Sequence, residues 1–270
     1  MTQTRVRLDV WLTEHGLAET RSRAQALIMA GQIVVNGRVE HKSGRAVEQA
    51  DTVQVVQSLP YVSRGGVKLA HALEAFHIEP GDWSVIDIGA STGGFTDCWL
   101  QFGAGRVYAV DVGYGQLDWR LRQDSRVVVM ERTNARYLTA DQLGGLAADG
   151  ASVDASFIGL RLLLEPLHAL LKSTGVVVAL VKPQFEAGRR QVGKGGVVRK
   201  PEVHLGVLRD VIAQAHSLSY SVGGLAPSPI RGPQGNIEFL LYLLKGPGRD
   251  VALDIPAVVD AAWKAGNEDA

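Results

Sequence analysis

The fold is decided by the stretch Val85-Ile86-Asp87-Ile88-Gly89-Ala90-Ser91-Thr92-Gly93-Gly94-Phe95. The short run ending at Ile88 predicts a buried strand, the glycines predict a tight turn, and Gly94 opens a predicted helix. Glycines in such a turn let the backbone approach a ligand closely. The stretch therefore predicts the strand, turn and helix at which many α/β proteins bind a nucleoside-bearing cofactor.

Strands and helices alternate on both sides of this turn. After the strand at 85–88, we predict strands at 107–110, 127–130, 153–155 and 176–181, and helices at 66–77, 94–102, 160–171 and 204–216. Such alternation is typical of a parallel sheet covered by helices. The last two predicted strands, 220–225 and 237–244, have no helix between them and predict a hairpin. The main domain is therefore expected to be an α/β, Rossmann-like sheet with one antiparallel strand.

A carboxylate follows the second of these strands. Asp111 lies about twenty residues beyond the glycine turn, where such a side chain binds the hydroxyl pair of a ribose in NAD or in S-adenosylmethionine. Asp87 inside the first strand, and a spacing other than G-x-G-x-x-G, favour S-adenosylmethionine. Asn134 follows a later strand and is equally consistent with adenine contact or with capping a loop. The predicted cofactor site comprises Asp87, Gly89, Ala90, Ser91, Gly93, Gly94, Phe95, Asp111, Asn134 and Asp154.

Four charged side chains are expected at the carboxyl edge of the sheet. Asp154 and Lys182 end two neighbouring strands, and Glu238 begins the last strand, which reaches the same edge if it runs antiparallel. Lys68 lies on the helix before the first strand, and the amino end of that helix can reach this edge. A hydroxyl nucleophile is a weak acid and needs a base or a cation beside it. This set therefore predicts methylation of a hydroxyl, whereas base methylation calls for a cysteine nucleophile or an Asn/Asp-Pro-Pro-Tyr/Phe loop.

Composition limits the class of protein. The 270 residues suit one large domain and one small one, and 46% hydrophobic with 21% charged residues is typical of a soluble globular protein. The one cysteine, Cys98, excludes an internal disulfide and a cysteine zinc site, and no metal is predicted. The polar start and the lack of a long apolar run predict a cytoplasmic protein with no membrane partner.

The first 58 residues read as a separate basic module, although the net charge of the chain is zero. Apolar residues at helical spacing follow Thr20 and Ser22, either of which could cap a helix. Asn36-Gly37 predicts a hairpin turn after a short strand, and a closing strand follows Asp51. The pattern predicts a small α+β domain that presents cations to nucleic acid.

The sequence resembles the TlyA family, the hemolysin-A-like rRNA 2′-O-methyltransferases related to the FtsJ/RrmJ methyltransferases. The resemblance covers nearly the whole chain and is carried by residues 87–97, 154–157, 181–186 and 193–199. It implies S-adenosylmethionine as cofactor and Lys68, Asp154, Lys182 and Glu238 as a catalytic tetrad with Lys182 as the central base. It further implies that the product is 2′-O-methylcytidine in 16S or 23S rRNA within ribosomal subunits.

In Arg7-Leu8-Asp9, Gly16-Leu17-Ala18, Ala26-Leu27-Ile28 and Val35-Asn36-Gly37, the front module resembles the S4 RNA-binding domain. This resemblance implies an RNA-binding domain at 1–58. The break at Pro60 predicts a linker at 59–63, followed by the methyltransferase domain at 64–246 and a tail at 247–270. A glycine-rich basic loop at 187–200 could cover the active edge as a lid. The expected RNA contacts are Arg5, Arg7, Arg21, Arg23, Lys42, Arg64, Arg189 and Lys194. Two alternatives are a membrane-active hemolysin and an RNA-binding assembly factor without catalysis.

Overall fold

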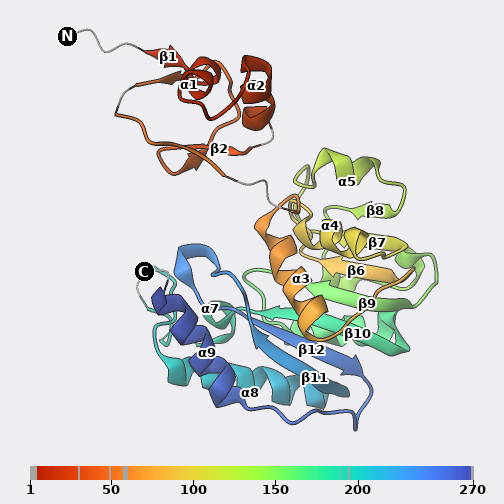
Figure 1. The fold of residues 1–270 in the computed structure, drawn as a ribbon. Coiled ribbons are helices and arrows are strands. Elements are labelled where there is room, and N and C mark those ends of the chain that lie inside the picture. Colours follow the sequence, from red (N-terminus) through yellow and green to blue (C-terminus); the bar gives the residue numbers. More distant parts are fainter. Residues whose placement is uncertain are drawn as a thin grey trace. The chain divides into compact units, whose positions relative to one another are not determined.

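The computed structural model describes residues 5–29, 31–48, 50–56, 60–188, 190–193 and 195–268, without the side chains of residues 233 and 266–268. The chain divides into two compact units, Met1–Pro60 and Tyr61–Ala270. Both are drawn as ribbons in Figure 1. The predicted linker at 59–63 spans the point where the first unit ends and the second begins.

The first unit is a small α+β domain. Its helices are α1 (Leu8–Glu14) and α2 (Arg21–Met29), and its short strands are β1 (Val6–Arg7), β2 (Ile33–Val35), β3 (Arg38–Val39), β4 (Ala46–Val47) and β5 (Val53–Val55). The Thr20 hydroxyl accepts a hydrogen bond from Arg23 N at 3.1 Å, so Thr20 caps α2 and Ser22 lies inside the helix. Asn36 and Gly37 both have positive φ, as the predicted hairpin turn between β2 and β3 requires.

The second unit is built on a seven-stranded sheet in the order β11-β12-β10-β9-β6-β7-β8. The strands are β6 (Ser84–Ile88), β7 (Arg106–Val110), β8 (Val127–Met130), β9 (Ala148–Val153), β10 (Leu171–Val181), β11 (Tyr220–Pro227) and β12 (Phe239–Lys245). β12 runs antiparallel to both of its neighbours, and the remaining neighbouring pairs are parallel. The predicted Rossmann-like sheet with one antiparallel strand is therefore confirmed.

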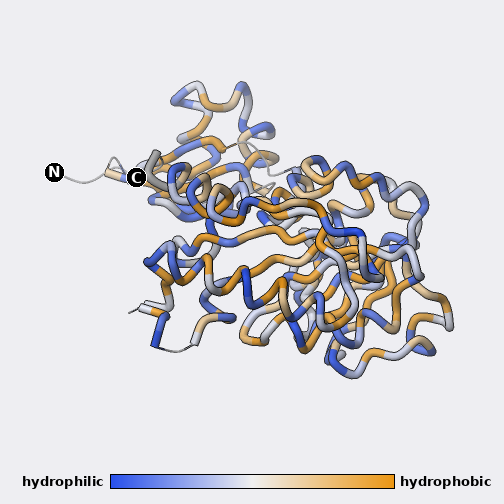
Figure 2. Tube along the Cα trace, turned by 90° about the horizontal axis from the view of Figure 1, so that it is seen from below, coloured by the Kyte–Doolittle hydropathy of each residue, from blue (hydrophilic) through white to orange (hydrophobic). Residues whose placement is uncertain are grey.

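Helices cover both faces of this sheet (Figure 1). The helices are α3 (Arg64–Ala75), α4 (Gly94–Gln101), α5 (Trp119–Gln123), α6 (Arg161–Leu170), α7 (Pro183–Glu186), α8 (Pro201–Ser217) and α9 (Ile255–Glu268). Along β10, Val177 and Ala179 join the core shared with α6, α8 and α9, whereas Val178 and Leu180 join the core shared with α3 and α4. Burial on both faces explains why residues 176–181 of this strand are an uninterrupted apolar run, whereas residues 172–174 are polar and exposed. Figure 2 shows hydrophobic residues along the strands.

Several boundaries differ from the prediction, and β10 starts at Leu171 rather than at 176 because the polar residues after Leu171 interrupt the apolar pattern. The strand expected at 153–155 is β9, which starts at Ala148 and ends at Val153, because the polar residue Asp149 and Gly150 hid its first half from the apolar pattern. The expected tail holds the fourteen-residue helix α9, whose Val259 and Ala262 are buried against the core formed with α8. Among the described residues, no helix is long and apolar enough to cross a membrane.

Candidate active site

The glycine turn lies where the order of the sheet reverses. From β6 the chain builds β7 and β8 on one side, and then returns to build β9 and β10 on the other. Ligands of open α/β sheets bind at the carboxyl ends of strands on either side of such a reversal. Gly89 has a φ of 81°, and a Cβ atom there would lie 2.7 Å from the carbonyl oxygen of Asp154. Only glycine fits, because the turn passes so close to the end of β9.

A cleft of about 460 Å³ opens beside this turn. Six residues of the predicted cofactor site line it: Gly89, Ala90, Ser91, Gly94, Phe95 and Asp154. Lys68 and Arg64 from α3 line it as well. The first turn of α4 supplies backbone N–H groups to the cleft, which suit a carboxylate, and Asp154 supplies a negative charge, which suits an amino group. The cleft therefore fits the zwitterionic amino-acid end of S-adenosylmethionine.

Asp111 follows β7 and is tied to the glycine turn. Its Oδ2 accepts a hydrogen bond from Ser91 N at 2.8 Å, and its Oδ1 accepts one from Gly113 N at 2.6 Å. These bonds fix the carboxylate beside the turn. Each oxygen retains a second acceptor position, so the side chain can still receive two ribose hydroxyls.

Asp87 was expected at the cofactor, and the structure corrects this expectation. It is fully buried inside β6, its Oδ2 accepts from Thr96 Oγ1 at 2.7 Å, and its Oδ1 accepts from Ser152 Oγ at 2.8 Å. Burial raises the pKa of this carboxyl to about 6. Asp87 therefore ties β6 to α4 and β9 and does not line the cleft. Sequence could not reveal this, because its partners lie on other elements.

Two further predicted cofactor residues have structural contacts. Gly93, with a φ of 98°, precedes α4, and a Cβ atom there would lie 2.2 Å from Leu121 Cδ1. Packing against α5 thus requires glycine at this position. The side chain of Asn134 accepts a hydrogen bond from Arg136 N at 3.1 Å and caps a 3₁₀ turn (Ala135–Tyr137). The capping role, one of the two alternatives for Asn134, is the one observed.

The four charged residues of the predicted tetrad form two ion pairs. Lys68 Nζ lies 2.5 Å from Glu238 Oε2, and Lys182 Nζ lies 2.6 Å from Asp154 Oδ1. Lys68 and Lys182 are 7% and 8% exposed, and Glu238 is 1% exposed. Lys68 and Asp154 both line the cleft, so the two pairs meet at its wall. The antiparallel course of β12 brings Glu238 to this edge.

Lys182 has a second polar contact that the sequence did not reveal. Its Nζ donates a hydrogen bond to Ser156 Oγ at 3.0 Å and lies 3.4 Å from the carbonyl oxygen of Asp154. The loop after β9 thus contacts Lys182 Nζ through three oxygen atoms. Ser63 and Arg231-Gly232 also line the cleft without having been predicted. Ser63 could have been found, because a serine directly before a helical pattern is a capping signal.

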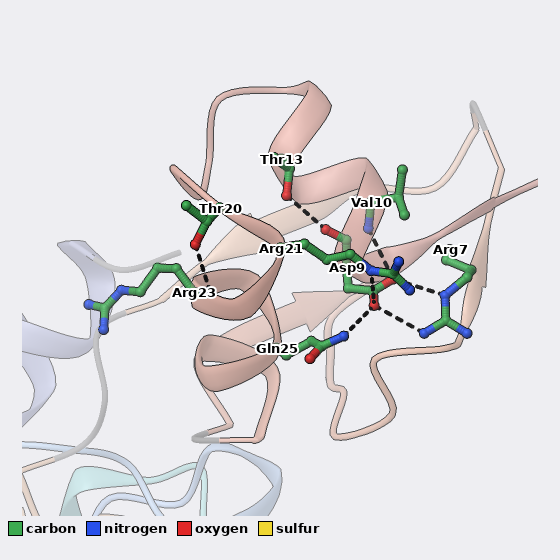
Figure 3. A network of polar contacts seen from close by, with 8 residues as sticks. All are labelled: Arg7, Asp9, Val10, Thr13, Thr20, Arg21, Arg23 and Gln25. Atoms are coloured by element: carbon green, nitrogen blue, oxygen red, sulfur yellow. Dashed lines mark hydrogen bonds and ion pairs between the residues drawn. The ribbon is translucent and has the colours of Figure 1, made fainter.

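In the first unit, the buried Asp9 organises two of the predicted RNA contacts (Figure 3). Its Oδ1 accepts from Arg7 Nε at 3.0 Å, and its Oδ2 accepts from Arg7 Nη2, Arg21 Nε and Gln25 Nε2. The hydrogen bond from Arg7 is the largest cause that lowers the pKa of Asp9. The side chains of Arg7 and Arg21 remain 51% and 56% exposed. Both guanidinium groups are therefore fixed in direction and still accessible.

The other predicted RNA contacts differ in their surroundings. Arg5 is paired with Glu48 at 2.7 Å, whereas Arg23 and Lys42 are exposed. Arg64 Nη2 donates to the carbonyl oxygen of Arg231 at 3.0 Å. Arg189 and Lys194 lie outside the described residues, so the structure gives no contact for them.

Comparison with known proteins agrees with this geometry. Residues 61–245 match the FtsJ-like methyltransferase family, and residues 6–53 match the S4 domain. The 16S/23S rRNA (cytidine-2′-O)-methyltransferase TlyA of Mycobacterium tuberculosis (strain CDC 1551 / Oshkosh) is 43% identical over 98% of both chains. YqxC of Bacillus subtilis (strain 168), named as a candidate rRNA methyltransferase, is 54% identical over 90% of this chain and 87% of its own. A solved structure of a candidate hemolysin from Streptococcus thermophilus is 46% identical, covers 99% of both chains and superposes with a TM-score of 0.78.

The sheet order, the glycine turn and the two ion pairs define the class of protein as a Rossmann-like methyltransferase with a separate N-terminal domain. The chain belongs to the FtsJ-like methyltransferase family, and within it to the TlyA proteins, which its identity to the mycobacterial enzyme over nearly its whole length establishes.

Proposed function

We propose that this protein transfers the methyl group of S-adenosylmethionine to the 2′-hydroxyl of a cytidine in ribosomal RNA. The observation that carries the proposal is the meeting of the Lys68–Glu238 and Lys182–Asp154 pairs at the wall of one cleft. The match to the FtsJ-like methyltransferases and the similarity to TlyA support it. Ribosomal RNA as substrate also implies that the protein acts in the cytoplasm.

The residues of the cleft, together with Asp111 beside the glycine turn, can hold the cofactor at both ends. Gly89, Gly94 and the first turn of α4 would receive its amino-acid end, and Asp111 would receive its ribose. When bound, the cofactor supplies an electrophilic methyl group on a sulfonium. Asp154 belongs both to the cleft and to the tetrad, so it connects the cofactor's end of the site with Lys182.

The tetrad prepares the nucleophile. The 2′-hydroxyl must lose its proton as the methyl group moves from the sulfonium sulfur to the 2′-oxygen, and Lys182 Nζ, once it has itself given up a proton, would accept it. The carboxylate of Asp154 and the hydroxyl of Ser156 hold this nitrogen in place. Lys68, positioned by Glu238, supplies a cation that stabilises the developing negative charge on the oxygen. Holding these groups in fixed positions lowers the entropic cost of the reaction.

The S4 unit supplies the affinity for RNA. Arg7 and Arg21, held by Asp9, present guanidinium groups that bind phosphates with fixed geometry. Arg23 and Lys42 add exposed positive charge. Recognition of helix shape and phosphates is typical of proteins that bind structured RNA.

Radiolabelled methyl transfer to separated ribosomal subunits, followed by nucleoside analysis, tests the proposal. We expect 2′-O-methylcytidine from at least one subunit, and its absence from both would refute the assignment. Lys182→Ala should abolish transfer while cofactor binding, measured by calorimetry, is retained. Lys172→Ala is the matched control, because Lys172 lies at the other end of β10 and pairs with Asp149 at 2.6 Å outside the cleft. Methyl transfer by Lys182→Ala would show that another residue acts as the base.

A further inference from the structure

A second cavity of about 400 Å³ adjoins the candidate active site. It is lined by Arg64 and His71 of α3, by Pro227 at the end of β11 and the loop 228–231 after it, by Ile237 and Glu238 before β12, and by Ala262 and Ala265 of α9. Arg64 and Arg231 line this cavity and the cofactor cleft alike. The cleft and this cavity are therefore neighbours that share two arginine residues, and Glu238 of the predicted tetrad lines the cavity.

The charge of this cavity suits a phosphate. The guanidinium groups of Arg64 and Arg231 donate to carbonyl oxygens of Arg231 and Gly235 and keep further N–H groups available. His71 lines the cavity without an ion pair to any described residue. Glu238 is the one carboxylate among the lining residues, and its Oε2 is already bound by Lys68. The cavity therefore offers uncompensated hydrogen-bond donors of positive character.

Apart from Ser228, the remaining lining is apolar and suits the face of a nucleobase. Pro229 and Ile230 come from the loop, Ile237 precedes β12, and Ala262 and Ala265 come from α9. At the end nearest the tetrad, Glu238 Oε1 is buried and has no hydrogen-bond partner among the described residues. An acceptor in this state is costly unless a donor reaches it. A ribose hydroxyl is such a donor, and it is a group that distinguishes RNA from DNA.

We propose that this cavity binds the nucleotide adjacent to the methylated one in the RNA strand. Its phosphate would lie against Arg64, Arg231 and His71, and its base against Ala265 and the apolar wall of α9. The inference rests on the proposed function, because a ribose held at the tetrad places its covalent neighbour beside Glu238. The helix α9 then forms part of the substrate site and contributes to the choice of sequence around the methylated nucleotide.

Filling the cavity tests this assignment. Ala265→Trp places a large side chain into it from an exposed position, and Ala261→Trp is the matched control, since Ala261 is exposed on the same helix and does not line the cavity. We expect Ala265→Trp to raise KM for the ribosomal subunit that is the substrate about tenfold, because the binding free energy of one stacked base corresponds to about that change in affinity. The Kd for S-adenosylmethionine and the melting temperature should match those of Ala261→Trp. Equal KM values for the two variants would overturn the proposal.

A second measurement uses the unaltered protein. Once the methylated position is mapped, RNA fragments with an abasic site on its 5′ or 3′ side are compared as substrates. We expect one of the two to raise KM for the wild type about tenfold, and to have little further effect on Ala265→Trp. Normal KM with both fragments would overturn the inference and leave the proposed function intact. Absence of 2′-O-methylation by the wild type on natural subunits would instead remove the proposed function.

Discussion

The buried ion pair of Lys68 and Glu238 offers a test that separates folding from methyl transfer. Lys68 is 7% and Glu238 1% exposed, so removing either partner leaves a charge with almost no water around it. Breaking a buried pair in this way costs about 3–5 kcal/mol of folding free energy. In a unit of this size, we expect Lys68→Met to lower the melting temperature on the order of 10 °C. Differential scanning calorimetry measures this change directly.

The double variant Lys68→Met/Glu238→Met is the matched control. Replacing both charges by apolar side chains of similar length removes the unpaired charge, and such replacements are often neutral or stabilising. We expect the double variant to regain most of the lost melting temperature, while neither variant transfers methyl groups. A double variant that melts as low as Lys68→Met would refute the electrostatic reasoning. Methyl transfer by either variant would refute the catalytic role of the pair.

Three other expectations concern single carboxylates. Asp111→Ala should raise the Kd for S-adenosylmethionine on the order of tenfold, measured by calorimetry, because a fixed acceptor for the ribose is lost; unchanged affinity would remove Asp111 from the cofactor site. Asp87→Asn should leave that Kd nearly unchanged. The raised pKa of Asp87 means that the folded wild type binds the proton more tightly than the unfolded chain, so its stability falls as pH rises from 3.8 to about 6. For Asp87→Asn, the free energy of unfolding measured in urea should not fall between these two pH values. The same pH dependence in the variant and the wild type would contradict the raised pKa of Asp87. Asp9→Asn should weaken RNA binding roughly tenfold in filter binding, because Arg7 and Arg21 lose their common anchor; loss of cofactor binding in the same variant would point to general misfolding instead.

Local patterns predicted most of the fold, because burial selects apolar residues and tight turns select residues that tolerate positive φ. The apolar run of β10 reflects burial on both faces, and Asn36-Gly37 reflects a turn that requires positive φ at two positions. The glycine turn was found for the same reason, since Gly89 lies too close to the end of β9 to carry a side chain. The edge at which Asp154, Lys182 and Glu238 lie also followed from sequence, because it depends on strand direction, whereas Lys68 reaches it from α3.

Only the tertiary structure decided which charges pair and which are buried. Lys68 and Glu238 are separated by 170 positions, and their contact depends on the antiparallel course of β12. Asp87 lies inside β6, and Asp154 directly follows β9, in similar sequence surroundings. In the structure, Asp87 is bound by Thr96 and Ser152, whereas Asp154 lines the cleft. The sequence by itself thus determined the class of fold and the sheet edge at which the four charged residues gather. The tertiary structure determined which side chains pair and which are buried, because hydrogen bonding and burial depend on distance in space.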